Sequence, residues 1–273
     1  MIEAVGKSGL PIDIRELAAE DVRPSMERLA RDGVRRVAVA GGDGTIAIGA
    51  ALASKLGMEL AVIPGGTLNH LAKDLGIPEA LDDALRLALT GEARPVDAGS
   101  VNGHLFLNTS SVGTYVTFVR MRERLERFLG YRLASIVAAI RLLIRPRAFT
   151  VELEVEGQMR SDVTPLVFIG VSERELKLPT LGGRATNGRR GLHLMIVRGR
   201  SRARFAALAF AAAARGTRSA TRSPALDAFI VNKLTIRMRR PHVYVATDGE
   251  LHAMSGPLEF AWVADAVKVV VPR

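Results

Sequence analysis

The stretch AVAGGDGTIAIGAAL, residues 38–52, joins an apolar run to an amphipathic one through a glycine-rich turn. The run from Val34 to Ala40 is typical of a buried strand, and the apolar residues that follow Thr45 recur at helical spacing. Glycines at such a turn permit a tight bend and a close approach of a ligand, and the helix N-terminus that follows favours negative charge. Asp43 has no evident packing role there, so the sequence indicates either a plain strand-to-helix turn or a site where Asp43 holds a metal ion or takes a proton.

A second glycine-rich turn lies in IPGGTLNHLAKDLGIP, residues 63–78. Gly65 and Gly66 permit a tight bend after an apolar strand, Thr67 is a natural N-cap for the next helix, and Asn69 offers an amide donor. Open α/β sheets bind ligands beyond the carboxyl ends of their strands. We therefore expect the two glycine turns to lie side by side at such an edge.

A third motif is VATDGELHAM, residues 245–254. Asp248-Gly249 is a common hairpin turn, and that is one interpretation of the segment. The other is that Asp248 and Glu250 belong to an extended segment and point the same way, which gives two carboxylates on one face. Such a pair could bind Mg²⁺ or accept a proton.

Length and composition favour a globular protein with one large domain or two smaller ones. The chain has 273 residues, of which 48% are hydrophobic and 24% charged. The absence of cysteine excludes disulfides, thiolate metal sites and a cysteine nucleophile. No apolar stretch approaches the roughly 20 residues of a membrane span, and no secretory signal is evident. We expect a cytoplasmic protein, with peripheral contact to the inner face of the membrane as an open alternative.

The chain is strongly basic, with a formal net charge of +10, and this favours anionic partners. Only 5% of the residues are aromatic, and no basic patch is interleaved with aromatic side chains, so we do not expect nucleic acid as a partner. Arginines gather along a long amphipathic helix expected at 116–144. They either form a solvated face or attract an anionic membrane surface. These arginines and two just beyond them are Arg120, Arg122, Arg124, Arg127, Arg132, Arg141, Arg145 and Arg147.

Periodicity predicts two lobes, residues 1–95 with a C-terminal tail at about 258–273, and residues 96–257. The first alternates strands and helices, which predicts a mostly parallel sheet: strands at 34–40 and 59–63, helices at 25–31, 45–56, 67–75 and 79–90. The second opens with a hairpin signal, Asn102-Gly103, and is rich in strands. Its expected elements are strands at 149–156, 165–171, 192–197, 233–238 and 243–247, a long loop at 173–191 and a helix at 202–214, before a last strand at 267–271.

GGDGT at 41–45, PGGTLNHLAKDLGIP at 64–78 and TDGE at 247–250, in this order, resemble the diacylglycerol kinase catalytic-domain family. That family includes sphingosine and ceramide kinases and bacterial lipid kinases. The resemblance runs from about Val34, and FLNTSSVG at 106–113 is similar to the segment that opens the family's second lobe. It implies a Rossmann-like α/β lobe that binds ATP and a β-rich, sandwich-like lobe that receives a lipid.

The resemblance also implies a reaction: transfer of the γ-phosphoryl group of ATP, with Mg²⁺, to a hydroxyl of a diacylglycerol- or sphingoid-like lipid. It makes Glu250 the acceptor of the hydroxyl proton, with Asp248 beside it and Asp43 as a third catalytic residue. The residues that it places around ATP are Gly41, Gly42, Asp43, Gly44, Thr45, Gly66, Thr67 and Asn69.

Two departures from the family pattern keep other functions open. The strand and Asn-Pro-x-Ser-Gly loop with which the family begins are not found in this sequence. Arg189 and Arg190 occupy the stretch where many members have the carboxylates of a structural Mg²⁺ site, so we do not expect that site. The alternatives are a catalytically impaired relative that binds lipid or nucleotide, and an NAD-kinase-like enzyme, since GGDGT is shared with NAD kinases.

Overall fold

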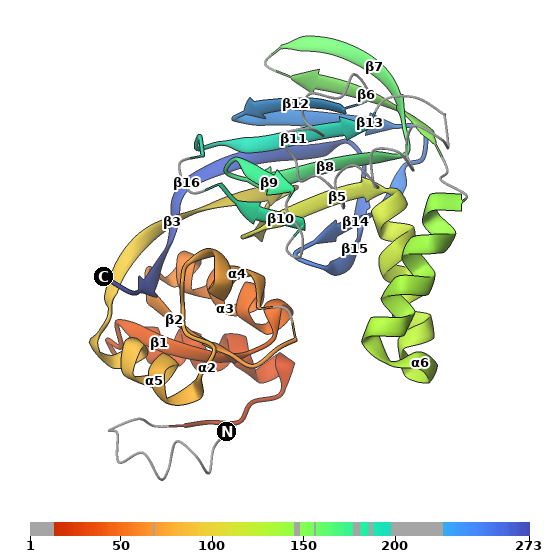
Figure 1. Ribbon diagram of the computed structural model, residues 1–273. Helices are drawn as coiled ribbons and strands as arrows, with labels where there is room; N and C mark the ends of the chain where they lie inside the picture. Colours follow the sequence, from red (N-terminus) through yellow and green to blue (C-terminus); the bar gives the residue numbers. More distant parts are fainter. Residues whose placement is uncertain are drawn as a thin grey trace. The chain divides into compact units, whose positions relative to one another are not determined.

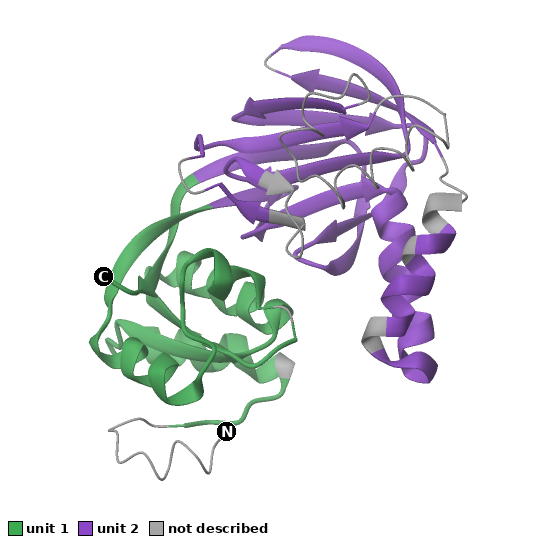
Figure 2. Ribbon diagram, in the orientation of Figure 1, with its two compact units in different colours: residues 1–97, 264–273 green, residues 98–263 purple. Residues whose placement is uncertain are grey.

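The computed structural model describes residues 14–67, 69–144, 148–155, 157–176, 181–185, 188–197 and 226–273. The chain divides into two compact units, Met1–Asp97 with Ala264–Arg273, and Ala98–Val263 (Figure 2). Of the two large sheets, the eight-stranded one is mixed and the six-stranded one is antiparallel, which confirms the α/β class with a β-rich second part. Two long strands, β3 (Glu92–Val101) and β16 (Leu258–Val271), contribute residues to both units.

The first unit is built on parallel strands, as its alternating sequence predicts (Figure 1). Strands β1 (Arg36–Gly41) and β2 (Glu59–Pro64) pair in parallel along their full lengths, so that Gly41 lies opposite Pro64. The end of β16 extends this sheet in parallel with β2. The helices of this unit are α2 (Ala19–Arg31), α3 (Asp43–Leu56), α4 (His70–Asp74) and α5 (Leu81–Thr90).

Burial explains why this part folds as a helix-covered sheet. In β2 the residues Leu60, Ala61, Val62 and Ile63 are all buried, the continuous apolar pattern of a parallel strand covered on both faces. Helix α3 lies close against β1 at Gly49, which has no side chain: a Cβ at this position would stand only 2.8 Å from Cγ2 of Val39. The helix-to-sheet packing thus fixes where the N-terminus of α3 lies relative to the ends of β1 and β2.

Helix α4 begins later than predicted. We expected it to start at Thr67 with that residue as N-cap, but it starts at His70. The residue before it, Asn69, has left-handed backbone geometry (φ 51°), and its side chain bonds to Gly66 instead of to the helix. The glycine turn is therefore longer than the capping rule predicted, and Thr67 is an exposed part of it.

The second unit contains a six-stranded antiparallel sheet in the order β12-β11-β8-β5-β14-β15. Its strands are β5 (Thr109–Gly113), β8 (Leu166–Val171), β11 (Leu192–Val197), β12 (Leu226–Val231), β14 (His242–Thr247) and β15 (Glu250–Ser255). A facing layer contains β4 (His104–Phe106), β6 (Phe149–Val155), β7 (Gln158–Thr164) and β13 (Lys233–Met238). Leu153 and Ile236 from this layer share one buried apolar cluster with Ile169 and Leu194 from the six-stranded sheet, the arrangement of a sandwich.

Some elements of the second unit differ from the sequence-based expectation. The hairpin at Asn102-Gly103 is confirmed, with φ values of 48° and 79° at the turn. The predicted loop at 173–191 instead contains two short strands, β9 (Arg174–Leu176) and β10 (Leu181–Arg184). Strands β7, β12 and β15 were not predicted: each ends the path of its sheet, and its polar or mixed sequence lacks a buried strand's apolar run. The helix expected at 202–214 lies outside the described residues.

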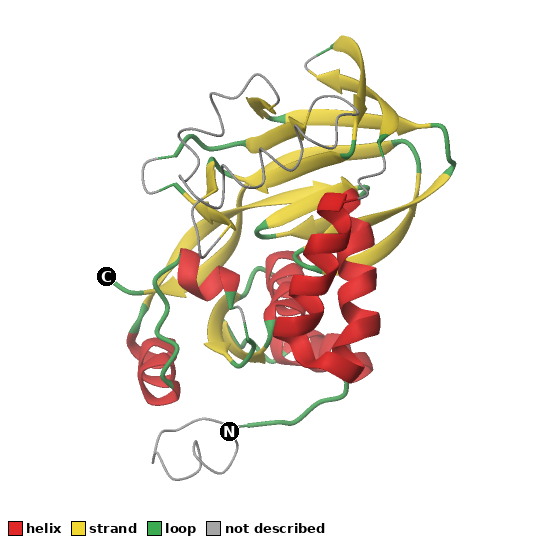
Figure 3. Cartoon of the chain, turned by 45° about the vertical axis from the view of Figure 1, so that its right-hand side comes forward, coloured by secondary structure: helices red, strands yellow, loops and turns green. Residues whose placement is uncertain are grey.

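The long helix α6 (Thr114–Ile144) is interrupted at Gly130, where φ is 69° and ψ is 164°. The chain turns back at this glycine, so the two halves of α6 run side by side as a helical hairpin (Figures 1 and 3). A single long helix at about 116–144 was predicted, because the apolar spacing continues through the glycine and does not reveal the bend.

Candidate active site

The two glycine turns of the first unit lie side by side, as predicted. The backbone N–H of Gly65 donates to the carbonyl oxygen of Gly41 over 2.9 Å. A Cβ on Gly66 would stand only 2.7 Å from Cα of Gly42, so the two backbones approach closely because neither residue carries a side chain.

Two polar side chains brace these turns. Oδ1 of Asp43, the first residue of α3, accepts the backbone N–H of His70, the first residue of α4, over 2.8 Å. Oδ1 of Asn69 accepts the N–H of Gly66 over 2.9 Å, and its Nδ2 donates to the Gly66 carbonyl over 3.0 Å. The carboxylate of Asp43 thus ties one turn to the other, a positioning role that its spacing in the sequence did not suggest.

The N-terminus of α3 follows directly from the first turn. Its N-cap, Gly42, is extended (φ −80°, ψ 178°) and has no side chain to bond the first-turn N–H groups. The helix is 14 residues long, so its N-terminal end carries a partial positive charge and backbone donors suited to phosphate oxygens. Two hydroxyl-bearing residues are exposed there, Thr45 in the first turn of α3 and Thr67 in the second glycine turn. This arrangement can bind an anionic group.

In the second unit, the Asp-Gly turn proves to be a hairpin turn whose half-buried aspartate bonds to a neighbouring segment. Asp248 and Gly249 have φ values of 49° and 90°, the geometry of a type I′ turn between β14 and β15. The Asp248 carboxylate accepts three backbone N–H groups, over 2.7 to 3.0 Å, and the Asp248 N–H donates to the carbonyl of Thr109. The three donors are Leu107, Asn108 and Thr109.

Electrostatics at Asp248 are a balance of opposing effects. Burial raises the pKa of the Asp248 carboxyl above its ordinary value, while the three N–H donors and the Arg174 guanidinium act to lower it. Arg174 is itself buried, and its Nε donates to the carbonyl of Val171 over 2.8 Å. Asp248 therefore anchors the β14–β15 turn to the segment that enters β5.

The interpretation that Asp248 and Glu250 present two carboxylates on one face is wrong. They stand on opposite sides of the turn glycine: Asp248 points into the protein, whereas Glu250 begins β15 and is exposed. Since side chains alternate along a strand, Glu250 shares its face of β15 with His252.

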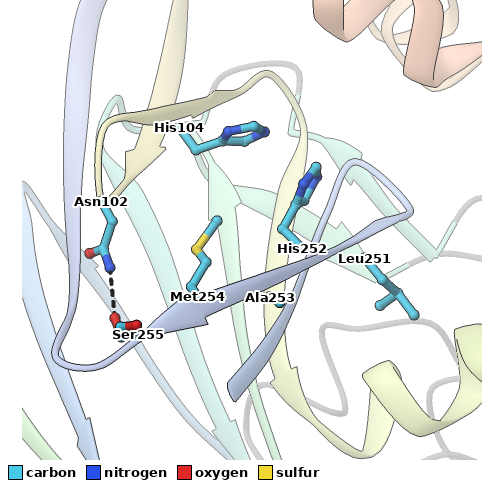
Figure 4. A pocket seen from close by; sticks show the side chains of 7 residues that line it. All are labelled: Asn102, His104, Leu251, His252, Ala253, Met254 and Ser255. Carbon is cyan, nitrogen blue, oxygen red and sulfur yellow. Dashed lines mark hydrogen bonds between the residues drawn. The ribbon is translucent and has the colours of Figure 1, made fainter. Parts of the chain in front are cut away.

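A pocket of about 500 Å³ lies beside β15 (Figure 4). The rings of His104 and His252 face each other at its edge, with their centroids 4.3 Å apart. Burial and the neighbouring His104 lower the pKa of His252, and the charge of Glu250 partly offsets this effect. Neither histidine was expected to have a role, because the two come from strands far apart in the chain. The lining residues are Asn102, His104, Leu251, His252, Ala253, Met254 and Ser255.

The two arginines at the expected position of a structural metal site have other contacts. The backbone N–H of Arg189 donates to Oε2 of Glu173 over 3.0 Å, and the Arg190 guanidinium lies 5.3 Å from the ring centre of Trp262. Within the described residues, no three histidine, aspartate or glutamate side chains gather into a group that could hold a metal ion. None of the described helices is long and apolar enough to cross a bilayer.

Comparison with known proteins relates the chain to a family of kinases. Residues 1–101 match the model of the diacylglycerol kinase catalytic domain. Lipid kinase YegS of Escherichia coli strain K12 is 37% identical over 132 residues, which cover 45% of this chain and 44% of that protein. Probable lipid kinase YegS-like of Pseudomonas aeruginosa strain UCBPP-PA14 is 41% identical over 127 residues, 42% of this chain and 41% of that protein. The match therefore spans less than half the length of these curated relatives.

Solved structures extend the likeness of fold to most of the chain. A diacylglycerol kinase from Bacillus anthracis strain Sterne has a TM-score of 0.67 at 19% identity, covering 95% of this chain and 84% of that one. A second structure from the same strain, assigned as a diacylglycerol kinase, has a TM-score of 0.74 at 22% identity and covers 95% and 85%. Both show that the two-part fold is shared.

Proposed function

We propose that the chain is a lipid kinase of the diacylglycerol kinase catalytic-domain family, whose model matches residues 1–101. The reaction would move the γ-phosphoryl group of ATP to a hydroxyl of a diacylglycerol- or sphingoid-like lipid. The observation that carries the proposal is the pair of braced glycine turns around the uncapped N-terminus of α3. The curated relatives described above are themselves named as lipid kinases, which supports a lipid acceptor.

We assign ATP binding to the first unit. Its turns offer backbone N–H groups from Gly42 to Thr45, a helix N-terminus and the exposed Thr67, all suited to phosphate oxygens. Asp43 and Asn69 would hold the turns in place through the hydrogen bonds described above. Mg²⁺ delivered with ATP would neutralise the negative charge that develops during transfer. The chain's own contribution is therefore positioning and electrostatic stabilisation.

We assign the acceptor to the second unit, with Glu250 as the group that takes the proton of the lipid hydroxyl. Its carboxylate is exposed at the start of β15, and its charge acts on His252, which lines the pocket, so we propose that it reaches a bound molecule. Asp248 would act as a positioning residue, because its carboxylate is bonded to backbone N–H groups and fixes the turn that presents Glu250. The pocket beside β15 would receive the polar part of the lipid.

The test is transfer of labelled phosphate from γ-labelled ATP with Mg²⁺ into a panel of lipids in mixed micelles. We expect the wild type to label one lipid class and Glu250→Gln to lower kcat by about 10²- to 10⁴-fold, the range for loss of a general base. Asp43→Asn should also impair transfer. Label in NAD and in none of the lipids, or ATP binding without any transfer, would contradict the proposal. We further propose that the enzyme works in the cytoplasm at an anionic membrane surface.

A further inference from the structure

The second half of α6 carries large apolar side chains on the side that faces solvent. Their exposed fractions lie between 41% and 57%: Leu133, Ile136, Val137 and Ile140. The spacing places all four on one stripe of the helix, about 100° wide. In the same half of α6, Ala134 and Ala138 are completely buried. The face that packs against the protein is therefore not the face that carries the four exposed apolar side chains. The outward stripe is thus a second apolar face with no partner among the described residues.

The turn of the hairpin continues this apolar surface. Phe128 is 83% exposed and Leu129 is 41% exposed, just before Gly130 turns the chain back. Figure 1 shows this turn at the end of the α6 hairpin that points away from the strands of the second unit. Continuous apolar surface of this kind on a protein that is otherwise charged marks a binding surface.

Basic side chains flank the apolar surface. The sequence of α6 contains six arginines and only two glutamates. Of the arginines, Arg124 and Arg127 are exposed close to the turn, and Arg141 is exposed near the other end. Arg122 is mostly buried beside Glu126. Exposed cationic residues therefore adjoin exposed apolar ones in the chain, Arg127 before Phe128 and Arg141 after Ile140, as in helices that lie in the plane of a membrane surface.

We propose that the α6 hairpin docks the protein on an anionic lipid bilayer, with Phe128, Leu129 and the apolar stripe at the acyl boundary and the arginines among the headgroups. The proposal rests on the proposed function in that a lipid kinase must reach a substrate held in a membrane. Fourteen residues of helix measure about 21 Å, less than the roughly 30 Å of a hydrocarbon core, so the element lies on the bilayer and does not span it. The chain's net charge of +10 disfavours a second copy as the occupant of this face.

The test is co-sedimentation of the full chain with phosphatidylcholine vesicles that contain or lack phosphatidylglycerol. The wild type should bind the anionic vesicles and lose binding as salt rises. Phe128→Ser combined with Ile140→Asn should weaken binding at least tenfold, and Arg124→Gln with Arg127→Gln by about fivefold per arginine. Met159→Thr is the matched control, since Met159 is 59% exposed on β7, outside α6, and this variant should bind like the wild type.

Several outcomes would overturn the docking surface. One is that the wild type and the α6 variants bind the vesicles equally well. Another is that binding does not depend on phosphatidylglycerol. A third is that the wild type is a dimer and the Phe128→Ser, Ile140→Asn variant is a monomer. A melting temperature of that variant several degrees lower would show that the face packs within the protein. Labelling of lipid in detergent micelles without vesicle binding would refute the docking surface alone. Vesicle binding without any phosphoryl transfer would refute the kinase proposal alone.

Discussion

Asp43 in the first unit and Asp248 in the second follow the same rule to different degrees. Each carboxylate accepts backbone N–H groups from a separate segment and so fixes a turn. Both aspartates are half-buried, but Asp43 accepts one such bond whereas Asp248 accepts three. The comparison teaches that an aspartate within a motif can serve a site by fixing a turn, which leaves backbone donors and Glu250 as the groups that we propose to face the reactants.

The largest expected effect on stability is at Asp248. Asp248→Ala would leave three backbone N–H groups without their acceptor, and we expect a loss of about 3 kcal/mol or more in the free energy of unfolding. Urea denaturation measures this change. Asp43→Ala removes a single such bond and should cost about 1 kcal/mol. Equal losses for the two variants would contradict the difference drawn between them.

A smaller loss is expected at the contact between the glycine turns. Gly66→Ala would place a Cβ 2.7 Å from Cα of Gly42, against backbone that cannot swing away. We expect about 1–3 kcal/mol of destabilisation from the forced separation, and at least tenfold weaker ATP binding, measured by calorimetry. Gly42→Ala is a useful comparison because its Cβ would meet Gly66 at an ordinary 3.6 Å and should destabilise less. If Gly66→Ala bound ATP with unchanged affinity, the close approach of Gly66 to Gly42 would not be needed for nucleotide binding, contrary to this prediction.

The sequence predicted the framework of the first unit well and the second less well. Apolar runs and helical spacing were sufficient for β1, β2 and α3, because burial there follows periodicity directly. The hydrogen bonds of the Asp248 carboxylate were beyond prediction, since its partners at 107–109 are about 140 residues away in the chain. The pairing of His104 with His252 likewise depends on strands that only the fold brings together.

The smallest effect concerns pH and His193, which is buried in the second unit. Its Nδ1 accepts the backbone N–H of Arg174 over 3.0 Å, and burial lowers the pKa of His193 below 6.5. The neutral form is therefore favoured in the folded state. Its contribution to stability is complete above pH 6.5 and is lost as pH falls through that value toward the lower folded pKa.

Unfolding by urea at pH 7.5 and at pH 5.5 checks this dependence. The wild type should lose stability at the lower pH, and His193→Gln should lose less between the same two values. His252→Gln serves as a comparison, because the pKa of His252 is also lowered by burial but its side chain is far less enclosed. A His193→Gln variant with the full wild-type pH dependence would contradict the assignment.

The central claim is that the glycine turns bind ATP and that Glu250 takes the proton of the acceptor hydroxyl. The most direct test measures ATP affinity and phosphoryl transfer on the same preparation of Glu250→Gln. The account predicts wild-type ATP affinity together with a loss of transfer of at least 10²-fold. Wild-type transfer in this variant, or a parallel loss of ATP binding, would contradict the division of roles between the two units.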